Sequence, residues 1–320
     1  MADPFKGWIC KHDRYNQVLD ALAEEVARAL AGGEPFMFTL LGQSRAGKSE
    51  LLRDVTARNS GSLSKSEHPQ VIHVPMPTEL NRDALALRIV ETVLGTADFK
   101  RPLRDMARRL LGSSGTLVML LDETNHLAEA RRSRAAQSKE NRALGDWIKE
   151  IFDMSRISIG LSGLPHSVSI LADNEQLESR ALRPMYLHPY DWSLDSDQKS
   201  FRQVVLAFVT QMKASGWAIE AHPEAVTRGA YVCGGGLVGK VRDIFHCAAE
   251  IGKHTERLDL PLLAKAFDRR FPRLVIGNPF ELPTLTDELL NESHRKTLAR
   301  GQAPTYQEKA KSGGKRNGRK

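Results

Sequence analysis

The chain has 320 residues, of which 41% are hydrophobic and 27% are charged, as in an ordinary globular protein. Its net charge of +7 favours a polyanionic partner without proving one. No apolar run approaches the ~18–20 residues of a membrane helix, and the first residues lack the apolar core of a signal peptide. The three cysteines, Cys10, Cys233 and Cys247, lie far apart, which argues against a disulfide framework or a zinc site and fits a reducing cytoplasm.

The first part of the chain places a glycine-rich loop between a strand pattern and a helix pattern. Apolar residues recur at helical spacing from Val18 to Leu30, and this pattern stops at Gly32. A short apolar strand at 36–41 then runs straight into the loop at 42–49, and a second helix follows the loop. This order of strand, glycine loop and helix is the context that a phosphate-binding loop requires.

Strand and helix patterns continue to alternate as far as residue 190. Further strands are predicted at 71–76, 116–122 and 156–163, with a fifth candidate at 185–190, and helices are predicted at 79–94, 101–112 and 138–153. Such alternation predicts an α/β fold in which a parallel sheet carries helices on both faces.

The pattern becomes all-helical after residue 190. Helices are predicted near 194–214, 223–232, 237–252 and 259–269, with a polar candidate at 286–299. We therefore expect an N-terminal lead-in and helix at 1–33, an α/β core at 34–190, a small helical domain at 191–272 and a basic tail at 273–320. The end of the tail is rich in Gly, Lys and Arg, and we expect it to be disordered.

The loop GQSRAGKS at 42–49 matches the pattern GxxxxGK[ST]. Its glycines let backbone N–H groups curl around phosphates at the positive end of the following helix. Lys48 can then reach the β- and γ-phosphates of ATP, and Ser49 can ligate Mg²⁺. The residues expected to bind the nucleotide here are Gly42, Gln43, Ser44, Arg45, Ala46, Gly47, Lys48, Ser49 and Glu50. The ten histidines show no spacing typical of ligands, so Mg²⁺ is the only metal expected.

An acidic pair ends the strand LVMLLDE at 117–123. Because parallel neighbouring strands end at the same edge of a sheet, these carboxylates are expected beside the glycine loop. Asp122 would hold Mg²⁺ through water, and Glu123 would act as a general base on the attacking water. Without the glycine loop the pair would be a weak signal, because many strands end in a carboxylate that meets solvent.

The fourth predicted strand ends in Ser162. In an ATPase fold with a neighbouring sensor strand, a small polar residue at this place contacts the γ-phosphate or the catalytic water. The alternative is a helix or turn cap near residues 163–165, and the sequence favours neither.

The order of glycine loop, acidic strand, polar-ended fourth strand and helical lid resembles an AAA+ ATPase. Further segments resemble the transposition ATPases called TniB and TnsC, over about residues 7–250. They are GWICKHDRYNQVLDAL before the loop, DETNHL at 122–127, GLSGLP at 160–165, NEQLESR at 174–180 and GGGLVGKVRDIFHCAA at 234–249. The ordered combination of these segments carries the resemblance.

This resemblance implies an ATP-dependent regulator of DNA transposition, related in role to the phage Mu B protein. Such proteins bind ATP between neighbouring subunits and assemble as rings or filaments on duplex DNA. They recruit a transposase and meet a target selector of the TniQ/TnsD type. Arg180, the arginine of NEQLESR, would reach the γ-phosphate of the next subunit as a finger, with Arg183 in reserve. The alternative for Arg180 is an ordinary surface arginine on a helix.

The resemblance also suggests roles for residues outside the two main motifs. Lys240 and Arg242, near the start of a lid helix, resemble a second sensor of phosphate, although a lid helix also carries ordinary solvated cations. His12 and Arg14 precede the first helix, where family members wrap the adenine. His126 is expected to be a structural residue rather than a catalyst.

Basic residues between two predicted helices are the candidates for contact with DNA. Phosphate contacts need cations held at loops and helix starts, and they give affinity that is sensitive to salt and tolerant of sequence. Lys100, Arg101 and Arg104 lie where the family has its DNA-facing segment, and the alternative is a solvated helix face. A second basic cluster, at 131–142, would line a subunit interface or a second DNA contact. The tail from Lys309 would bind DNA or transposase, or only aid solubility.

The leading hypothesis is therefore a bacterial cytoplasmic ATPase that assembles on duplex DNA, recruits a transposase and hydrolyses ATP slowly. A helicase-loader or initiator-type AAA+ protein would keep the same site and use other partners. A third hypothesis is a scaffold that binds nucleotide without hydrolysis, and Glu123 speaks against it. A small-molecule kinase is disfavoured because no substrate-specific motif accompanies the loop.

Overall fold

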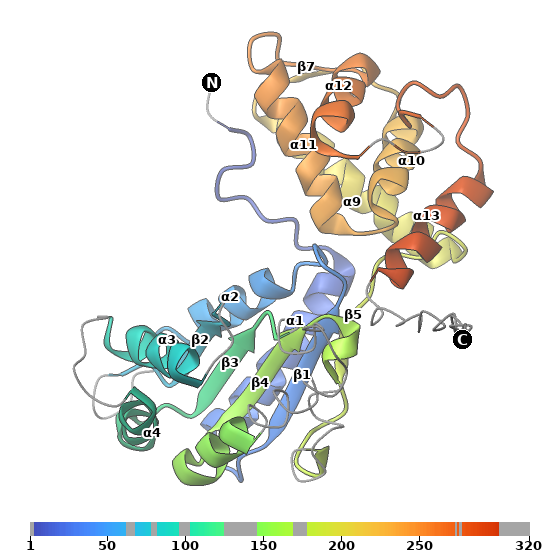
Figure 1. Ribbon diagram of the computed structural model, residues 1–320. Helices are drawn as coiled ribbons and strands as arrows, with labels where there is room; N and C mark the ends of the chain where they lie inside the picture. Colours follow the sequence, from blue (N-terminus) through green and yellow to red (C-terminus); the bar gives the residue numbers. More distant parts are fainter. Residues whose placement is uncertain are drawn as a thin grey trace, which may run out of the picture.

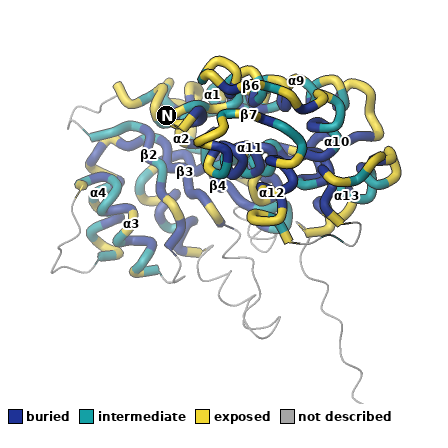
Figure 2. The backbone as a smooth tube through the Cα atoms, turned by 90° about the horizontal axis from the view of Figure 1, so that it is seen from above, coloured by how far each residue is buried: buried dark blue, intermediate teal, exposed yellow. Residues whose placement is uncertain are grey.

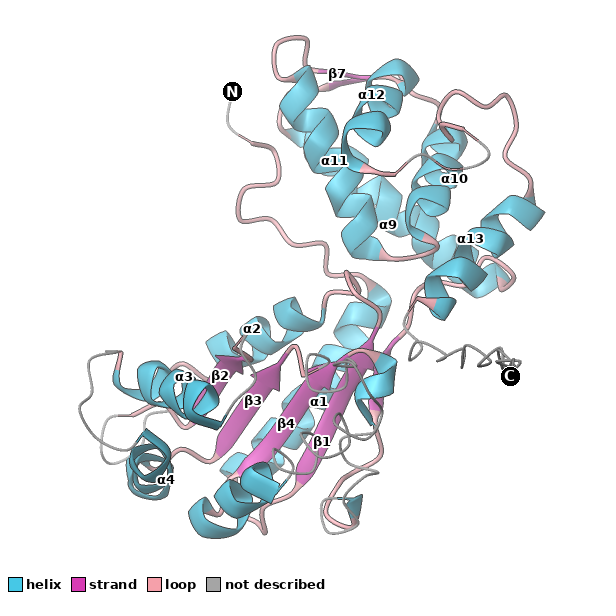
Figure 3. Ribbon diagram, viewed as in Figure 1, coloured by secondary structure: helices cyan, strands magenta, loops and turns pink. Residues whose placement is uncertain are grey.

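The computed structural model describes residues 3–61, 68–77, 82–95, 103–124, 146–168, 178–272, 274 and 277–300. In this part of the chain a parallel sheet with helices on both faces adjoins a group of helices (Figure 1, Figure 3). The predicted fold class, an α/β sheet followed by a helical region, is confirmed. Across the described ranges, no helix combines the length and the apolar character that crossing a membrane requires.

Five parallel strands form the sheet, in the order β2-β3-β4-β1-β5. They are β1 (Met37–Gly42), β2 (Val71–Pro75), β3 (Val118–Asp122), β4 (Ser158–Gly163) and β5 (Met185–Leu187). All five coincide with strands predicted from the sequence, although β5 ends at Leu187 instead of residue 190. Since β4 lies between β1 and β3, the acidic strand is not the direct neighbour of the strand that leads into the glycine loop.

Both faces of the sheet are buried because helices cover each of them. The helices are α1 (Asp13–Leu30) and α2 (Lys48–Arg58) on one face, and α3 (Arg82–Leu94), α4 (Leu103–Ser114) and residues 146–155 on the other. Alternate strand residues point to opposite faces, so Phe38 and Leu120 pack with the first group while Met37 and Leu121 pack with the second. Every residue of β1, β3 and β4 is consequently buried, which explains the continuous apolar runs in the sequence.

The second part of the chain is a helical group with its own core, here called the lid. Its helices are α9 (Asp195–Ala214), α10 (Pro223–Gly234), α11 (Val238–Gly252), α12 (Leu260–Arg270) and α13 (Asp287–Ala299). The sequence predicts only helices in this region, but β6 (Ala218–Ile219) and β7 (Arg257–Leu258) form a short parallel ladder. Strands of two residues are too short to show an alternating pattern, which explains why the sequence did not reveal them.

Both ends of the described chain pack into the lid. Phe5, from the N-terminal segment, and Phe280 and Leu290, from the C-terminal region, are buried in the same cluster as Phe208 and Tyr231 of the lid helices. Figure 2 shows this buried interior in dark blue. The predicted domain limits stay predictions. Side chains from the regions predicted as lead-in and tail share the core of the lid.

Replacing Gly160 with alanine is expected to lower the free energy of unfolding by about 1–3 kcal/mol, because adding atoms to a full core forces its neighbours apart. A Cβ at Gly160, in the middle of β4, would lie 2.5 Å from the Phe38 ring and 2.9 Å from Leu120. Gly112→Ala in α4 is the matched control, since a Cβ there meets no described atom within 4 Å and alanine favours a helix. Urea unfolding measures both variants, and a wild-type midpoint for Gly160→Ala would contradict this account of the packing.

Candidate nucleotide-binding site

The loop between β1 and α2 has the curled backbone that its glycines predict. Gly47, which caps the start of α2, has a φ of 109°, in the left-handed region that favours glycine. Arg45, in the same loop, has a φ of 67°, which is uncommon for a residue that carries a side chain. A loop that turns in this way forms a concave nest of backbone N–H groups, which suits an anion.

Lys48 is the first residue of α2, and its side chain folds back over the loop. Its Nζ donates hydrogen bonds to the carbonyl oxygens of Gly42, at 2.7 Å, and Gln43, at 2.9 Å. Burial lowers the pKa of Lys48 to about 8, and the negative charges of Asp122 and Glu123 oppose this shift. The ammonium group therefore lies within electrostatic reach of the acidic pair.

Asp122 is the last residue of β3 and is 4% exposed. Its Oδ1 accepts a hydrogen bond from the backbone N–H of Glu123 at 2.9 Å, and Nε2 of His73 lies 3.4 Å from its Oδ2. Burial by itself would raise the pKa of the Asp122 carboxyl, but the polar groups of His73, Ser49 and Ser162 hold that pKa below its usual value. The carboxyl group is therefore ionised at neutral pH.

Ser162 lies behind this carboxylate and does not line the open cavity described below. It is 1% exposed, and within the described chain its Oγ makes no hydrogen bond of good geometry, so it acts on Asp122 as a nearby dipole. Thr124 donates to the Ser162 carbonyl oxygen from its N–H, at 2.8 Å, and from its Oγ1, at 3.0 Å. These bonds tie the ends of β3 and β4 together. The predicted contact of Ser162 with a phosphate or water stays a prediction.

The oxygen groups predicted to hold Mg²⁺ fit this arrangement. The Ser49 hydroxyl lies close enough to Asp122 to lower the pKa of that carboxyl, and both residues offer the oxygen ligands that Mg²⁺ prefers. His73 faces the same carboxylate with a buried Nε2 that has no well-formed hydrogen bond in the described chain. Groups in this position orient metal ligands. His73 is not among the site residues expected from the sequence, although a histidine inside the apolar strand VIHVP is a signal for such a role.

Glu123 follows β3 on the exposed side of the site, with a φ of 60°. A residue with a side chain in this left-handed region costs about 1–3 kcal/mol, and such residues cluster at functional sites. Only four residues of the described ranges, glycines aside, have a positive φ, and two of them, Arg45 and Glu123, line one cavity. The strain therefore coincides with the site that the motifs predict.

That cavity, of about 690 Å³, lies where the glycine loop, the acidic pair and the lid meet. Lys48, Ser49 and the acidic pair form one side of it, and Gly239 and Arg242 of α11 reach it from the lid. Cations, oxygen ligands and a loop of backbone N–H groups in one cavity suit a phosphate chain with its metal.

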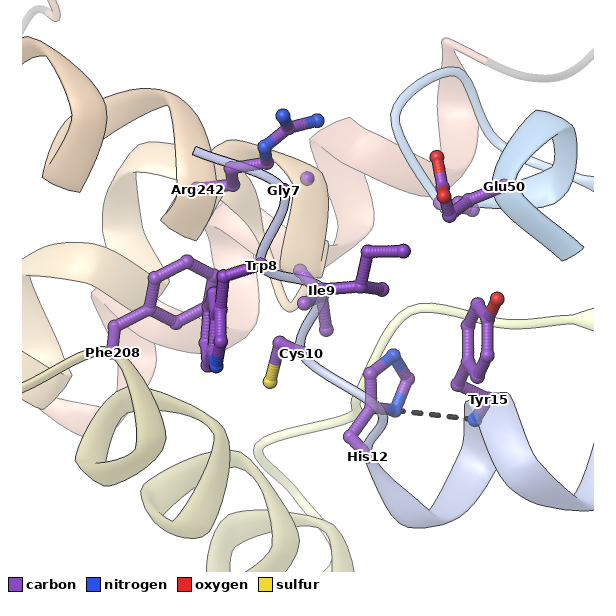
Figure 4. A pocket seen from close by; sticks show the side chains of 13 residues that line it. Gly7, Trp8, Ile9, Cys10, His12, Tyr15, Glu50, Phe208 and Arg242 are labelled. Carbon is purple, nitrogen blue, oxygen red and sulfur yellow. Dashed lines mark hydrogen bonds between the residues drawn. The ribbon is translucent and has the colours of Figure 1, made fainter. Parts of the chain in front are cut away.

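A smaller cavity, of about 240 Å³, opens beside the first (Figure 4). Residues 7–10 of the N-terminal segment, together with His12 and Tyr15, form one wall, and Phe208 and Val238 of the lid form another. The residues that line both cavities are Gly47, Glu50, Gly239 and Arg242. A mostly apolar cavity that adjoins a polar one suits a nucleotide base next to its phosphates.

His12 lies in the wall of the smaller cavity, and its predicted contact with an adenine stays a prediction. Its Nδ1 accepts a hydrogen bond from the backbone N–H of Tyr15 at 3.3 Å, which caps α1, and lies 2.8 Å from the Tyr190 hydroxyl (Figure 4 marks the first bond). Because Nδ1 accepts that bond, it carries no proton. Burial, and then the positive charge of Arg14, lower the pKa of His12 to about 4.

Arg14 lines neither of these two cavities. Its guanidinium group lies 2.6 Å from Asp197, donates to the Pro189 carbonyl oxygen at 2.6 Å and stacks over the Tyr190 ring. These contacts join α1 to the start of the lid, so the Arg14 side chain stabilises the packing between them.

The two cations of the predicted second sensor point to different places. Arg242 lines both cavities, and its Nε donates to His246 at 3.3 Å. Lys240 lines neither cavity, and its Nζ lies 5.4 Å from the centre of the Phe271 ring. Of the pair, Arg242 is therefore the residue that the geometry brings to the site.

Arg180 and Arg183 lie at the other end of β1 from the glycine loop. The N–H of Met37, the first residue of β1, donates to the Arg180 carbonyl oxygen at 3.0 Å. The guanidinium group of Arg180 pairs with Asp153, whereas Arg183 is exposed and has no hydrogen-bond or ion-pair partner among the described residues. Neither arginine lines the larger cavity, beside the glycine loop of its own chain.

Of the three residues predicted to contact DNA, only Arg104 lies within the described residues. Its Nε pairs with Asp83 at 2.7 Å on the exposed surface, which links α4 to α3. Lys100 and Arg101 lie outside the described residues, as do His126 and the second basic cluster. Their predicted roles stay predictions.

A phosphate-binding loop after β1, an acidic pair after β3 and a helical lid against the loop, on a sheet ordered β2-β3-β4-β1-β5, define a P-loop protein with the AAA+ fold. More narrowly, the chain belongs to the TniB family. The family model described as bacterial TniB protein matches residues 6–191, which is more than half of the chain. A comparison with curated proteins finds no significant match.

Solved structures share this fold at low sequence identity. The Aeropyrum pernix ORC2 protein, in ADPNP–ADP complexes, is 17% identical with a TM-score of 0.57, over 81% of this chain and 69% of that one. The ORC1 protein of the same organism, in complex with DNA, is 18% identical with a TM-score of 0.56, over 81% and 65%. Cdc6p from Pyrobaculum aerophilum is 15% identical with a TM-score of 0.57, over 91% and 82%.

His12→Asn is expected to remove part of the acid sensitivity of the protein. An unfolded histidine takes up a proton below about pH 6.5, but His12 in the folded protein stays neutral down to about pH 4. The free energy of unfolding therefore falls as the pH drops between these values, by at most about 3 kcal/mol. Asparagine keeps the helix cap without titrating.

Urea unfolding at pH 7, 5.5 and 4.5 measures this effect. The variant should lose less stability on acidification than the wild type, while His254→Asn, at an exposed position, should follow the wild type. Equal losses in the wild type and in His12→Asn would contradict the assignment.

Proposed function

We propose that the chain binds ATP in the two joined cavities and hydrolyses it there. The observation that carries the proposal is the meeting of Lys48, the acidic pair and Arg242 around one strained loop, with a mostly apolar cavity beside them. Membership of the TniB family supports it. The shared fold of the Aeropyrum pernix ORC2 protein, solved in ADPNP–ADP complexes, is consistent with a nucleotide at this place.

Each side chain would act on a particular atom. Lys48 would leave the loop carbonyl oxygens for the β- and γ-phosphate oxygens, whose charge offsets the burial of its ammonium group. Glu123 would accept the proton of the attacking water. Ser49 and Asp122 would hold Mg²⁺, which neutralises charge on the phosphates when it is bound. Arg242, on the lid side of the cavity, would contact the phosphate oxygens.

A second copy of the chain would complete the site. Because Arg180 and Arg183 lie at the opposite end of β1 from their own glycine loop, the phosphate that they can serve belongs to a neighbouring subunit. Such a contact is head to tail, and repeated head-to-tail contacts generate rings or helical filaments. Arg183 has no described partner to release, whereas Arg180 would first have to leave Asp153.

Assembly on duplex DNA would then serve transposition. The TniB match supports a regulator that recruits a transposase, together with a target selector of the TniQ/TnsD type. The net charge of +7 supports a polyanionic partner, and Lys100, Arg101 and Arg104 are the proposed phosphate contacts. The fold shared with ORC and Cdc6 proteins, one of them solved in complex with DNA, makes an initiator-type role the second candidate.

Glu123→Gln is expected to bind ATP and to lower its turnover about 100-fold or more, because the amide cannot accept the proton of water. Lys48→Ala should instead lose nucleotide binding. Phosphate release and the binding of a fluorescent ATP analogue, measured on both variants, separate the two roles. Hydrolysis at the wild-type rate by Glu123→Gln would show that another group is the base.

Electron microscopy of the purified protein with duplex DNA tests the assembly. Rings or filaments are expected with ATP, and not with ADP or without nucleotide. Replacing Lys100 and Arg101 with alanine should lower the salt dependence of DNA binding by about one unit of slope per residue. Monomers under every condition would remove the case for a shared site and for the role in transposition, while leaving the nucleotide site of the single chain.

A further inference from the structure

The C-terminal helix α13 docks on the end of α10 through hydroxyl groups. Ser293 donates from Oγ to the Val232 carbonyl oxygen at 2.8 Å, and Thr297 donates from Oγ1 to the Gly234 carbonyl oxygen at 3.3 Å. The last carbonyl groups of a helix have no partner within that helix. The hydroxyl groups of α13 therefore donate hydrogen bonds to carbonyl oxygens that have no partner within α10, at its C-terminal end.

The turn that follows α10 is shaped to receive α13. Gly235 has a φ of 57°, and a Cβ at this residue would lie 2.3 Å from Oγ1 of Thr297 and 2.6 Å from the Ser293 carbonyl oxygen. Nδ1 of His294, which is 7% exposed, lies 3.1 Å from the Gly235 carbonyl oxygen. A side chain at Gly235 would push the helix away, so the backbone of this turn depends on glycine for the contact.

The same helix also contacts the glycine loop at 42–49. Gln43, in the loop, donates from Nε2 to the carbonyl oxygen of Leu298 at 3.3 Å, at the end of α13. Gln43 is 7% exposed, and its own carbonyl oxygen accepts the hydrogen bond from Nζ of Lys48 at 2.9 Å. One glutamine thus connects the last turn of α13 to the ammonium group at the centre of the site.

The lid contacts the glycine loop at several points. Besides the bond to Gln43, the N–H of Gly239 in α11 donates to the Arg45 carbonyl oxygen at 3.0 Å, and the Arg45 guanidinium group lies 3.6 Å from Asp243 of the same helix. The turn that α13 covers leads directly into α11, so these contacts belong to one connected unit. In Figure 1, α13 runs from the outer part of the lid down to its boundary with the sheet.

From these contacts we infer that α13 is a brace that controls how fast nucleotide leaves the site, an inference that rests on the proposed nucleotide function. While α13 is docked, it holds the turn at Gly235 and the side chain of Gln43, whose carbonyl oxygen accepts a hydrogen bond from Lys48. When it lifts, the contacts of the lid with the glycine loop loosen, and nucleotide release becomes faster.

Release of fluorescent ADP from the full-length protein, chased with unlabelled ADP, tests the brace. Ser293→Ala/Thr297→Val removes both hydroxyl contacts with little change of shape, and Gln43→Leu removes the contact with Leu298. Each change should speed release about fivefold, as expected for the loss of ordinary hydrogen bonds. Arg295→Ala, at an exposed position of the same helix where the arginine forms no described hydrogen bond or ion pair and acts only on the charge of Glu292, is the matched control and should release ADP at the wild-type rate.

The combined triple variant distinguishes a brace from separate local effects. If all three side chains act through the docking of α13, the triple variant should release ADP more slowly than the product of the two separate effects predicts. An unchanged release rate in Ser293→Ala/Thr297→Val, with a lower thermal midpoint, would give α13 a role in stability alone and overturn the inference. Effects that multiply fully would also overturn it.

The same experiment separates this inference from the function on which it rests. A wild-type protein that binds no fluorescent ADP would overturn the nucleotide site, and the brace with it. A wild-type protein that binds fluorescent ADP, and releases it at a rate that no change in α13 alters, would overturn the brace alone.

Discussion

The close approach of the lid to the glycine loop is the contact on which the candidate site depends. The N–H of Gly239 donates to the Arg45 carbonyl oxygen at 3.0 Å, and a Cβ at Gly239 would lie 2.3 Å from that oxygen. Only glycine lets α11 come this near, and the approach brings Arg242 to both cavities. With α11 further away, the smaller cavity would lose a wall and the larger cavity would lose its arginine. The contact at Gly239 therefore fixes the position of Arg242 relative to the backbone of the glycine loop.

The charges around the loop are arranged for a ligand that carries negative charge. Burial lowers the pKa of Lys48 to about 8, which measures how poorly its ammonium group is solvated. Polar neighbours keep Asp122 ionised although it is buried. The negative charge of a phosphate chain would stabilise the buried ammonium group of Lys48, and a divalent cation would bind the ionised carboxylate of Asp122. The strained backbones of Arg45 and Glu123 lie at the same cavity, so electrostatics and geometry point to one place.

The strand β1 lies between the candidate site and the arginine proposed to serve a neighbouring subunit. The nucleotide loop follows its last residue, and the backbone of Arg180 pairs with its first. The strand keeps these two features apart, so in the proposed reaction the arginine would come from a neighbouring subunit. On the lid side, α13 adds a second connection, from the C-terminal region to the loop through Gln43. The glycine loop is thus connected to β1 on one side and to the C-terminal helix of the lid on the other.

The sequence by itself determined the five strands, the glycine loop with Lys48 and Ser49, and the acidic pair, because each rests on a local period or a fixed spacing. Only the tertiary structure decided that β4 separates β1 from β3, and that His73 faces Asp122. It also decided that the N-terminal segment and Phe208 share one cavity, that Arg14 pairs with Asp197, and that α13 reaches Gln43. These features depend on contacts between residues far apart in the chain, and no local pattern encodes which distant side chain fills a given space.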